Sequence, residues 1–133
     1  VLLMAIGEFP VPADLGALVG GWLVYCLFTF SLCLVLAPLS EMSDVLERFM
    51  PVTTYIMIPF SGTFNMVSWL TPEAQAAMYY SPFVHGMELM RHGIFGERIN
   101  AQWDLTVPLA ASMIFMLIGL AMCRTVRRQL VVE

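Results

Sequence analysis

The stretch LGALVGGWLVYCLFTFSLCLVLAPLS, Leu15 to Ser40, runs for 26 residues without an Asp, Glu, Lys or Arg. About 20 predominantly apolar residues are enough for a helix to cross the hydrocarbon core of a bilayer. We therefore predict a transmembrane helix, called a span below, over residues 15–39. Its length predicts a tilt, and Pro38 is expected to mark its end, because proline cannot donate the next helical hydrogen bond.

The composition of the whole chain supports a membrane protein. Of its 133 residues, 59% are hydrophobic and only 12% are charged, whereas soluble domains carry about 25% charged residues. So few charges cannot solvate a surface, and much of the outside is expected to face lipid. The net charge of −4 and the absence of lysine exclude a nucleic-acid partner, because a phosphate backbone needs a basic stripe.

Two further uncharged runs follow, Phe49–Pro72 and Leu105–Cys123. The second run predicts an ordinary span over residues 105–123. The first predicts a broken span over residues 49–70, because Pro59 removes a backbone hydrogen bond. It is either a bent span inside a bundle or a helix that ends part-way and lines a pathway. In both cases protein or a water-filled cavity has to satisfy the freed carbonyl groups.

The ends of the chain suggest a larger protein with a defined orientation. Residues 1–7 are apolar without a basic n-region, so we interpret them as the end of an earlier span and the chain as a C-terminal piece. With residues 124–133 as a cytoplasmic tail, four arginines lie inside and two, Arg91 and Arg98, lie outside, as the positive-inside rule favours. The inside set is Arg48, Arg124, Arg127 and Arg128.

Small residues in the apolar runs carry two predictions. Gly16 and Gly20 form a Gly-x-x-x-Gly pair, which predicts close packing of the first span against another helix. The cysteines are odd in number and lie within or at the end of apolar runs, so we interpret them as buried hydrophobic residues rather than disulfide or metal ligands. They are Cys26, Cys33 and Cys123.

The stretch between the last two runs, residues 71–97, predicts short helices. Thr71-Pro72 and Ser81-Pro82 are typical helix starts, and Gly93 and Gly96 are expected to close the second helix. Within it, an apolar stripe recurs at helical spacing. The stripe is Phe83, Met87, Met90 and Ile94.

Four polar residues of this helix lie away from the stripe: His85, Glu88, Arg91 and His92. Arg91 follows Glu88 by three positions and is close enough to pair with it. Because a charge at the bilayer centre costs about 2.5–3.5 kcal/mol, the helix should lie at the outer interface or be re-entrant, with its polar face against protein or water. A polar network that positions the helix is the favoured interpretation, and substrate contact stays open.

A metal or catalytic role for this cluster is disfavoured. Helical metal pairs place two histidines four residues apart, whereas His85 and His92 are seven apart, about 10 Å along the axis. The chain also has no G-x-x-x-x-G-K-[ST] loop, so we expect it to bind no ATP and no other cofactor directly.

In order, these features resemble the membrane permease subunits of type-2 ABC exporters, particularly those for capsular polysaccharide or O-antigen. The first element is LSEMSDVLERFMP (39–51), with Asp44-Val45, and the second is IPFSGTFNMVSWLTP (58–72), with Ser61-Gly62 and Leu70-Thr71-Pro72. The third is SPFVHGMELMRHGIFG (81–96), which is similar to the family's Asn-Pro-x-x-His-x-x-Glu-x-x-Arg segment, with Ser81 in place of Asn. Its matching residues are Pro82, His85, Glu88 and Arg91.

The resemblance implies an all-α membrane fold: the C-terminal half of a six-helix domain, with a broken fifth span and re-entrant periplasmic helices over residues 71–97. It implies a bacterial inner-membrane protein that is not itself an enzyme. Two permease copies would form the channel for a polysaccharide, and two cytoplasmic subunits would bind and hydrolyse ATP.

A sugar polymer needs a wet passage with aromatic faces for its rings and polar groups for its hydroxyls. Candidates for that passage are Tyr55, Phe60, Phe64, Asn65, Trp69, Tyr79, Tyr80 and Phe83. Each aromatic residue taken alone is equally typical of packing or of an interface anchor.

Contacts with the ATPase subunits are expected on the cytoplasmic side. The candidates are Glu41, Asp44, Arg48, Arg124, Arg127 and Arg128. For the arginines of the tail, lipid headgroups are an equal alternative.

Two other functions remain open. The same scaffold would also suit export of a drug, a lipid or another small substrate. A membrane enzyme using His85, Glu88 and His92 is the alternative of another class, and it predicts that replacing either histidine abolishes turnover without disturbing assembly.

Overall fold

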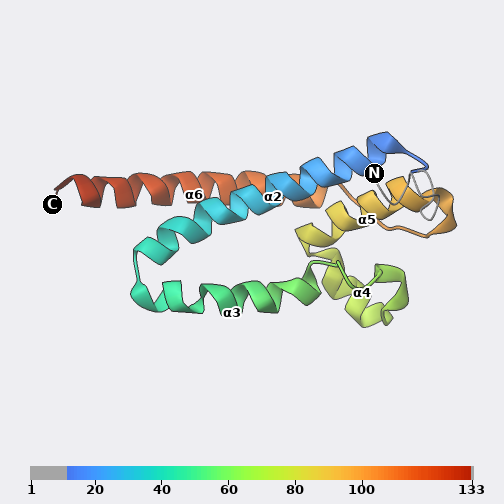
Figure 1. Ribbon diagram of the computed structural model, residues 1–133, viewed down its shortest axis with the longest axis horizontal. Coiled ribbons are helices and arrows are strands. Elements are labelled where there is room, and N and C mark those ends of the chain that lie inside the picture. Colours follow the sequence, from blue (N-terminus) through green and yellow to red (C-terminus); the bar gives the residue numbers. More distant parts are fainter. Residues whose placement is uncertain (1–11, 133) are drawn as a thin grey trace, which may run out of the picture.

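A computed structural model describes residues 12–132 of the chain, the last four of them by backbone only. All regular elements of this part are helices and it contains no strand, which confirms the all-α prediction. Its elements, labelled as in Figure 1, are α2 (Leu15–Glu41), α3 (Asp44–Phe60), the 3-10 turn η1 (Val67–Trp69), α4 (Pro72–Tyr79), α5 (Pro82–Phe95), the 3-10 turn η2 (Gly96–Arg98) and α6 (Thr106–Val132). The expected earlier span at residues 1–7 lies outside the described residues.

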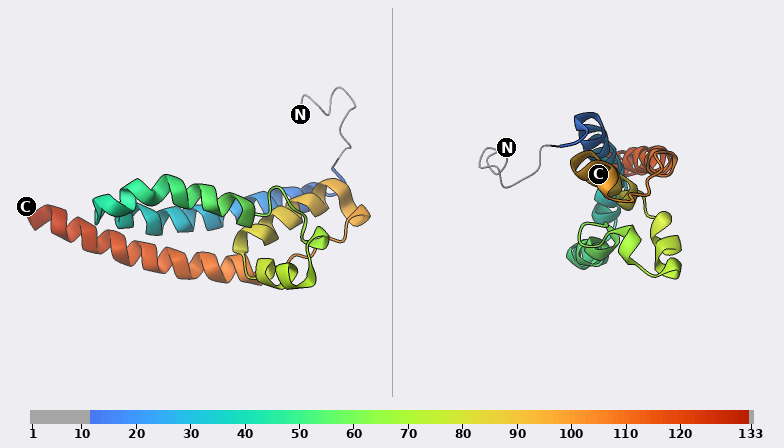
Figure 2. Two further views of the ribbon diagram at one scale, coloured as in Figure 1. Left: turned by 90° about the horizontal axis from the view of Figure 1, so that it is seen from below. Right: turned by 90° about the vertical axis from the view of Figure 1, so that its right-hand side faces the viewer.

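The helices form an elongated bundle around α2 (Figures 1 and 2). Helix α3 returns antiparallel to α2 after a two-residue turn at Met42–Ser43. Helix α6 runs alongside α2 in the same direction and extends past that turn, whereas α5 packs antiparallel against the first half of α2. Within residues 12–132, two helices are long and apolar enough to cross a membrane: α2 and the Thr106–Arg128 part of α6.

Helix α2 begins where the sequence predicts but ends later. The Asp14 side chain accepts hydrogen bonds from the N–H groups of Gly16 and Ala17, which satisfies donors of the first turn. Pro38 does not end the helix, which continues to Glu41. A proline this close to the end removes one hydrogen bond without stopping the last turn, and the Met42 N–H still donates to the Pro38 carbonyl.

Helix α3 takes the second of the two predicted forms, a helix that ends part-way. It begins at Asp44, five residues before the predicted start, and runs through Pro51 and Pro59 to Phe60. Acidic residues in its first turn favour this early start. Its 17 residues extend about 25 Å, less than the roughly 30 Å of a hydrocarbon core. The chain then leaves the helical conformation at Gly62, whose φ is +71°.

No described helix packs on the predicted Gly16/Gly20 pair, so that prediction stays a prediction. No described atom lies within 4 Å of a Cβ built on Gly20, whereas one built on Gly21 would lie 2.7 Å from the Met90 amide nitrogen. Helix α5 approaches the neighbouring face of α2, and a spacing of four residues does not reveal which face is covered.

Helix α5 meets α2 through its own glycines. A Cβ on Gly93 would lie 2.7 Å from the Leu18 Cα and 2.9 Å from the Asp14 carbonyl oxygen. Gly93, which was expected to close α5, therefore lies inside it as a packing residue, and Gly96 (φ +60°) ends the helix. Gly119 likewise allows close packing of α6 against α2, because a Cβ there would lie 2.8 Å from the Leu34 backbone.

The structure contradicts the predicted burial of the cysteines. Cys26 and Cys33 are exposed on α2 and Cys123 is half-buried on α6; all three are free. The reason is geometric: the described helices cover only part of the surface of α2, and the two exposed cysteines lie outside that part.

The core lies where α2, α5 and α6 meet. Phe28 of α2 packs edge-on against Phe83 of α5, with ring centroids 4.6 Å apart, and lies 5.8 Å from Phe115 of α6. Helix α3 adds nothing to it, since none of its residues, all of them described, is buried.

Candidate functional site

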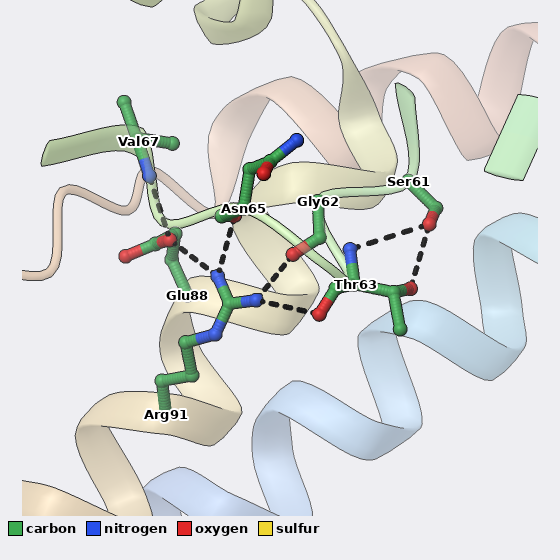
Figure 3. Close-up of polar contacts among 7 residues, drawn as sticks. All are labelled: Ser61, Gly62, Thr63, Asn65, Val67, Glu88 and Arg91. Carbon is green, nitrogen blue, oxygen red and sulfur yellow. Dashed lines mark hydrogen bonds and ion pairs between the residues drawn. The ribbon is translucent and has the colours of Figure 1, made fainter. Parts of the chain in front are cut away.

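The break after α3 is the most unusual backbone feature of the described chain. Residues 61–66, called the break segment here, connect α3 to η1 without regular structure and lie against α5 (Figure 3). A helix end leaves carbonyl groups without intrahelical partners, and at membrane depth these groups must find partners within the protein.

Arg91 of α5 supplies the hydrogen-bond partners for carbonyl groups of the break segment itself. Its Nη1 donates to the Asn65 carbonyl at 3.1 Å, and its Nη2 donates to the carbonyls of Thr63, at 3.0 Å, and Gly62. The planar guanidinium presents several N–H donors in a fixed fork. One side chain therefore binds three backbone carbonyls of the break segment.

Glu88, one helical turn earlier, completes this arrangement. Its Oε1 accepts a hydrogen bond from Arg91 Nη1 at 2.7 Å and another from the Val67 N–H at 3.3 Å. The Glu88 side chain is only 1% exposed. A buried carboxylate is tolerated when it is paired and hydrogen-bonded. We call Glu88 and Arg91 the clamp.

The clamp also fixes the direction of the Arg91 guanidinium. The Arg91 side chain is 16% exposed, and its guanidinium faces Glu88 and the break segment (Figure 3). Arg91 is therefore one half of an ion pair rather than a free cation.

Hydroxyl groups complete the end of α3. Ser61 Oγ donates to the Ile58 carbonyl at 2.6 Å and accepts from the Thr63 N–H, at 3.3 Å. Ser81 Oγ donates to the Phe60 carbonyl at 3.0 Å. Ser81 thus stands at the helix start as predicted, but its hydroxyl serves α3 and makes no cap bond to α5.

His85 belongs to a different cluster from the clamp. Its Nδ1 accepts the Asp104 N–H at 3.1 Å, so its Nε2 carries the proton and donates to the Tyr79 carbonyl at 2.8 Å. The ring is 1% exposed. Both nitrogens are therefore occupied by backbone groups, which leaves no lone pair for a metal or for proton transfer.

The predicted four-residue network is accordingly divided. Glu88 and Arg91 meet each other, His85 meets the chain around Tyr79 and Asp104, and His92 lies 6.4 Å from Trp103 between ring centroids. Helix α5 is enclosed by several elements, so each polar side chain finds a different partner. Within the described residues, no group of three His, Cys, Asp or Glu side chains is placed to hold a metal ion.

Asp104 organises the start of α6, and sequence reasoning missed it. Its carboxylate accepts the N–H and the hydroxyl of Thr106, at 2.9 and 2.7 Å, and the Tyr79 hydroxyl at 3.1 Å. The bonds from Thr106, more than the one from Tyr79, lower the pKa of Asp104. The bond to this carboxylate raises the pKa of Tyr79. The available signal was an Asp two residues before a helix start.

Only two of the predicted passage residues line a cavity between α2 and α3. Most of the predicted set is exposed, Phe64 at 72%, whereas Phe83 is buried in the core. The cavity has a volume of about 450 Å³ and includes Phe64 and Phe83 of the predicted set. Its polar lining comes from Tyr25, Thr29, Cys33, Thr54, Ser61 and Thr63. The other members of the set are Tyr55, Phe60, Asn65, Trp69, Tyr79 and Tyr80, none of which lines this cavity.

The predicted ATPase contacts, in contrast, gather at one end of the molecule. All six are exposed, and they lie at the α2–α3 turn and along the neighbouring end of α6 (Figure 1). Glu41 and Arg127 line the same cavity of about 360 Å³ there.

The described residues thus form an all-α structure with two potential membrane-crossing helices and a third, shorter helix followed by a clamped break segment. Comparison with known proteins adds the kind of protein. No family model and no solved structure matches the chain.

Curated relatives do match. The chain is 27% identical over 123 residues to the capsule polysaccharide export inner-membrane protein BexB of Haemophilus influenzae, covering 92% of this chain and 46% of the relative. It is 31% identical over 121 residues to CtrC, of the same description, from Neisseria meningitidis serogroup B, covering 91% and 46%. The predicted resemblance to capsule-export permeases is confirmed. The chain spans about half the length of the curated relatives it matches.

Proposed function

We propose that the chain is the C-terminal half of a channel-forming permease subunit that exports capsular or similar polysaccharide across the bacterial inner membrane, driven by ATP. The observation that carries the proposal is the similarity to capsule export proteins over nine-tenths of the chain. In this proposal α2 and α6 are spans four and six, and α3 with the break segment is the fifth.

Helices α4 and α5 are the re-entrant periplasmic pair. Gly93 accepts a hydrogen bond from the Asp14 N–H at 2.9 Å, which aligns the end of α5 with the start of α2. Phe83, near the start of α5, contacts Phe28 in the middle of α2. If α2 crosses the bilayer, α5 therefore begins near mid-depth and ends near the outer surface. The internal partners of His85 and Glu88 support this placement.

The cytoplasmic end is the one that holds the α2–α3 turn and the end of α6. Four of the six arginines, Arg48, Arg124, Arg127 and Arg128, lie there, which agrees with the positive-inside rule. Two ATP-binding subunits dock at this end and hydrolyse ATP, and the chain itself holds no cofactor.

The polymer passes between two copies of the permease. Support comes from α3, whose residues are described throughout and none of which is buried, and from the exposed aromatic side chains of Tyr55, Phe64 and Trp69. Exposed aromatic rings offer faces to sugar rings, and the hydroxyls of the α2–α3 cavity offer hydrogen bonds.

The test uses the full-length protein, tagged and purified from its native membranes in mild detergent. A Walker-motif ATPase should co-purify at about one copy per permease, as linked subunits of one transporter would. A strain lacking the gene should lose surface polysaccharide and regain it with the wild-type gene. The proposal would be overturned if the protein purified without an ATPase partner and the deletion strain kept its surface polysaccharide. That result would favour a different substrate for this protein.

A further inference from the structure

Helix α3 is joined to the rest of the described chain mainly at its two ends. One end is the Met42–Ser43 turn, and the other is the break segment. Between them, none of the described residues Asp44–Phe60 is buried. The position of the break segment therefore depends on the groups that hold it, and the clamp is the largest set of those groups.

The clamp acts on backbone, so it also orients side chains. The carbonyls of Gly62, Thr63 and Asn65 point at one guanidinium (Figure 3). With its carbonyl groups turned inward, the segment directs Phe64 outward, 72% exposed. Thr63 and Phe64 both line the α2–α3 cavity.

We propose that Glu88 and Arg91 are positioning residues for export: they hold the break segment in the conformation that presents Thr63 and Phe64 to the polymer, and the Arg91 charge does not itself bind the polymer. This inference rests on the proposed function. It assigns Arg91 a role through the geometry of its fork, whereas a cation that attracts acidic sugars would act through its charge alone.

The two roles separate in a lysine variant. Arg91→Lys keeps the positive charge but replaces the planar fork by a compact ammonium on a flexible stem. We expect Arg91→Lys and Arg91→Gln to lower surface polysaccharide to a similar extent, by about tenfold, the effect of losing one charge-assisted hydrogen bond. Near-wild-type export by Arg91→Lys together with loss of export by Arg91→Gln would overturn the inference in favour of a charge role.

A cross-link measures the position of the segment without any transport. A Cβ on Gly62 would lie 3.6 Å from the Val84 Cβ, within the range of about 3.5–4.5 Å that a disulfide needs. The full-length protein would carry Gly62→Cys and Val84→Cys, with its native cysteines replaced by serine. Each single variant, which forms no such bond, is the control for other cross-links.

Cross-linking in membranes is then compared with Arg91 present and with Arg91→Gln. Both proteins carry Gly62→Cys, so the backbone strain from this substitution is the same in both and does not affect the comparison. Without Arg91 we expect initial cross-linking to fall about tenfold, as for one lost charge-assisted hydrogen bond. Equal cross-linking in the two proteins would overturn the inference, even if the Arg91→Gln variant exported little polysaccharide.

The outcomes also separate this inference from the proposed function. If the wild-type gene restores no polysaccharide to the deletion strain, the proposed function fails, and the cross-link result still reports whether Arg91 positions the segment. If wild type restores export and cross-linking depends on Arg91, the inference requires that export by Arg91→Gln rises when the Gly62–Val84 disulfide is formed. No rise on oxidation would overturn it.

Discussion

Two regions of this chain are held together by opposite means. Helices α2, α5 and α6 meet through glycines and apolar side chains, with backbones so close that a Cβ at Gly21, Gly93 or Gly119 would overlap its neighbour. Helix α3 has no such contact among its described residues, and the segment that follows it is held by the polar contacts of the clamp.

The two regions should therefore respond differently to substitutions. Close backbone packing is non-polar and gains from many small contacts, so it is rigid and sensitive to volume. A polar clamp concentrates its stabilisation in a few directional bonds, so it is sensitive to single atoms. Four experiments in the full-length protein test this contrast between the two regions.

The largest effect is expected from Gly93→Val. The new side chain would meet the Leu18 backbone and the Asp14 carbonyl, which cannot move aside without separating α5 from α2. Overpacking of this kind costs about 3 kcal/mol or more. Thermal unfolding of the purified protein and its abundance in membranes would both report the loss.

Gly20→Ala is the matched control, because no described atom lies within 4 Å of the added methyl group. Alanine favours a helix over glycine by about 1 kcal/mol, so this variant should be as stable as wild type or more so. Destabilisation of both variants to the same degree would contradict the close-packing account.

The second effect tests the clamp. Glu88→Ala removes the acceptor for Arg91 and for the Val67 N–H, and leaves a partly buried cation without its counter-charge. Because Arg91 keeps its carbonyl acceptors and some exposure, we expect a cost of about 2–3 kcal/mol in unfolding free energy.

Glu97→Ala, at an exposed glutamate in η2, should change stability by less than about 0.5 kcal/mol. Equal melting temperatures for the two alanine variants would show that the Glu88–Arg91 pair contributes nothing measurable.

The third effect uses two glycines with positive φ, Gly62 at +71° and Gly96 at +60°. Substitution by alanine at either position costs about 1–3 kcal/mol, because an L side chain is strained at a positive φ. Only Gly62 lies in the break segment, so Gly62→Ala should lower export more than Gly96→Ala at similar stability. An export defect that simply follows stability would count against a special role of the segment.

The smallest effect concerns Asp104, a residue of intermediate exposure just before α6. Its pKa is lowered from the ordinary 3.8 by hydrogen bonds from Thr106, so its contribution is complete above pH 3.8 and is lost as pH falls through the lower folded value. The melting temperature of wild type should therefore fall more between about pH 5 and pH 3 than that of Asp104→Asn. Parallel pH curves would contradict this assignment.

Local features of the chain were predictable because they depend on composition and short spacing. A long uncharged run must be a helix at membrane depth, which located α2 and α6. The spacing of Glu88 and Arg91 predicted their pair, because residues three apart face each other on a helix. Pro59 predicted a break within residues 49–70, and the helical conformation ends after Phe60.

Other features depended on the tertiary structure. A helical period predicts that one face is buried but does not name its neighbour, so Gly21 and Gly93 rather than Gly16 and Gly20 make the close contacts. The sequence also did not show which neighbours the polar residues of α5 would meet. We predicted one network, whereas His85, His92 and the clamp make separate contacts.

Composition and local spacing were enough to show which segments are apolar enough to cross a membrane and which polar residues share α5. The inward turn of Arg91 onto the carbonyls of Gly62, Thr63 and Asn65 became apparent only in the folded chain. A helix break exposes backbone groups whose partner lies 26 to 29 positions away in the chain, and no local pattern encodes a contact at that separation.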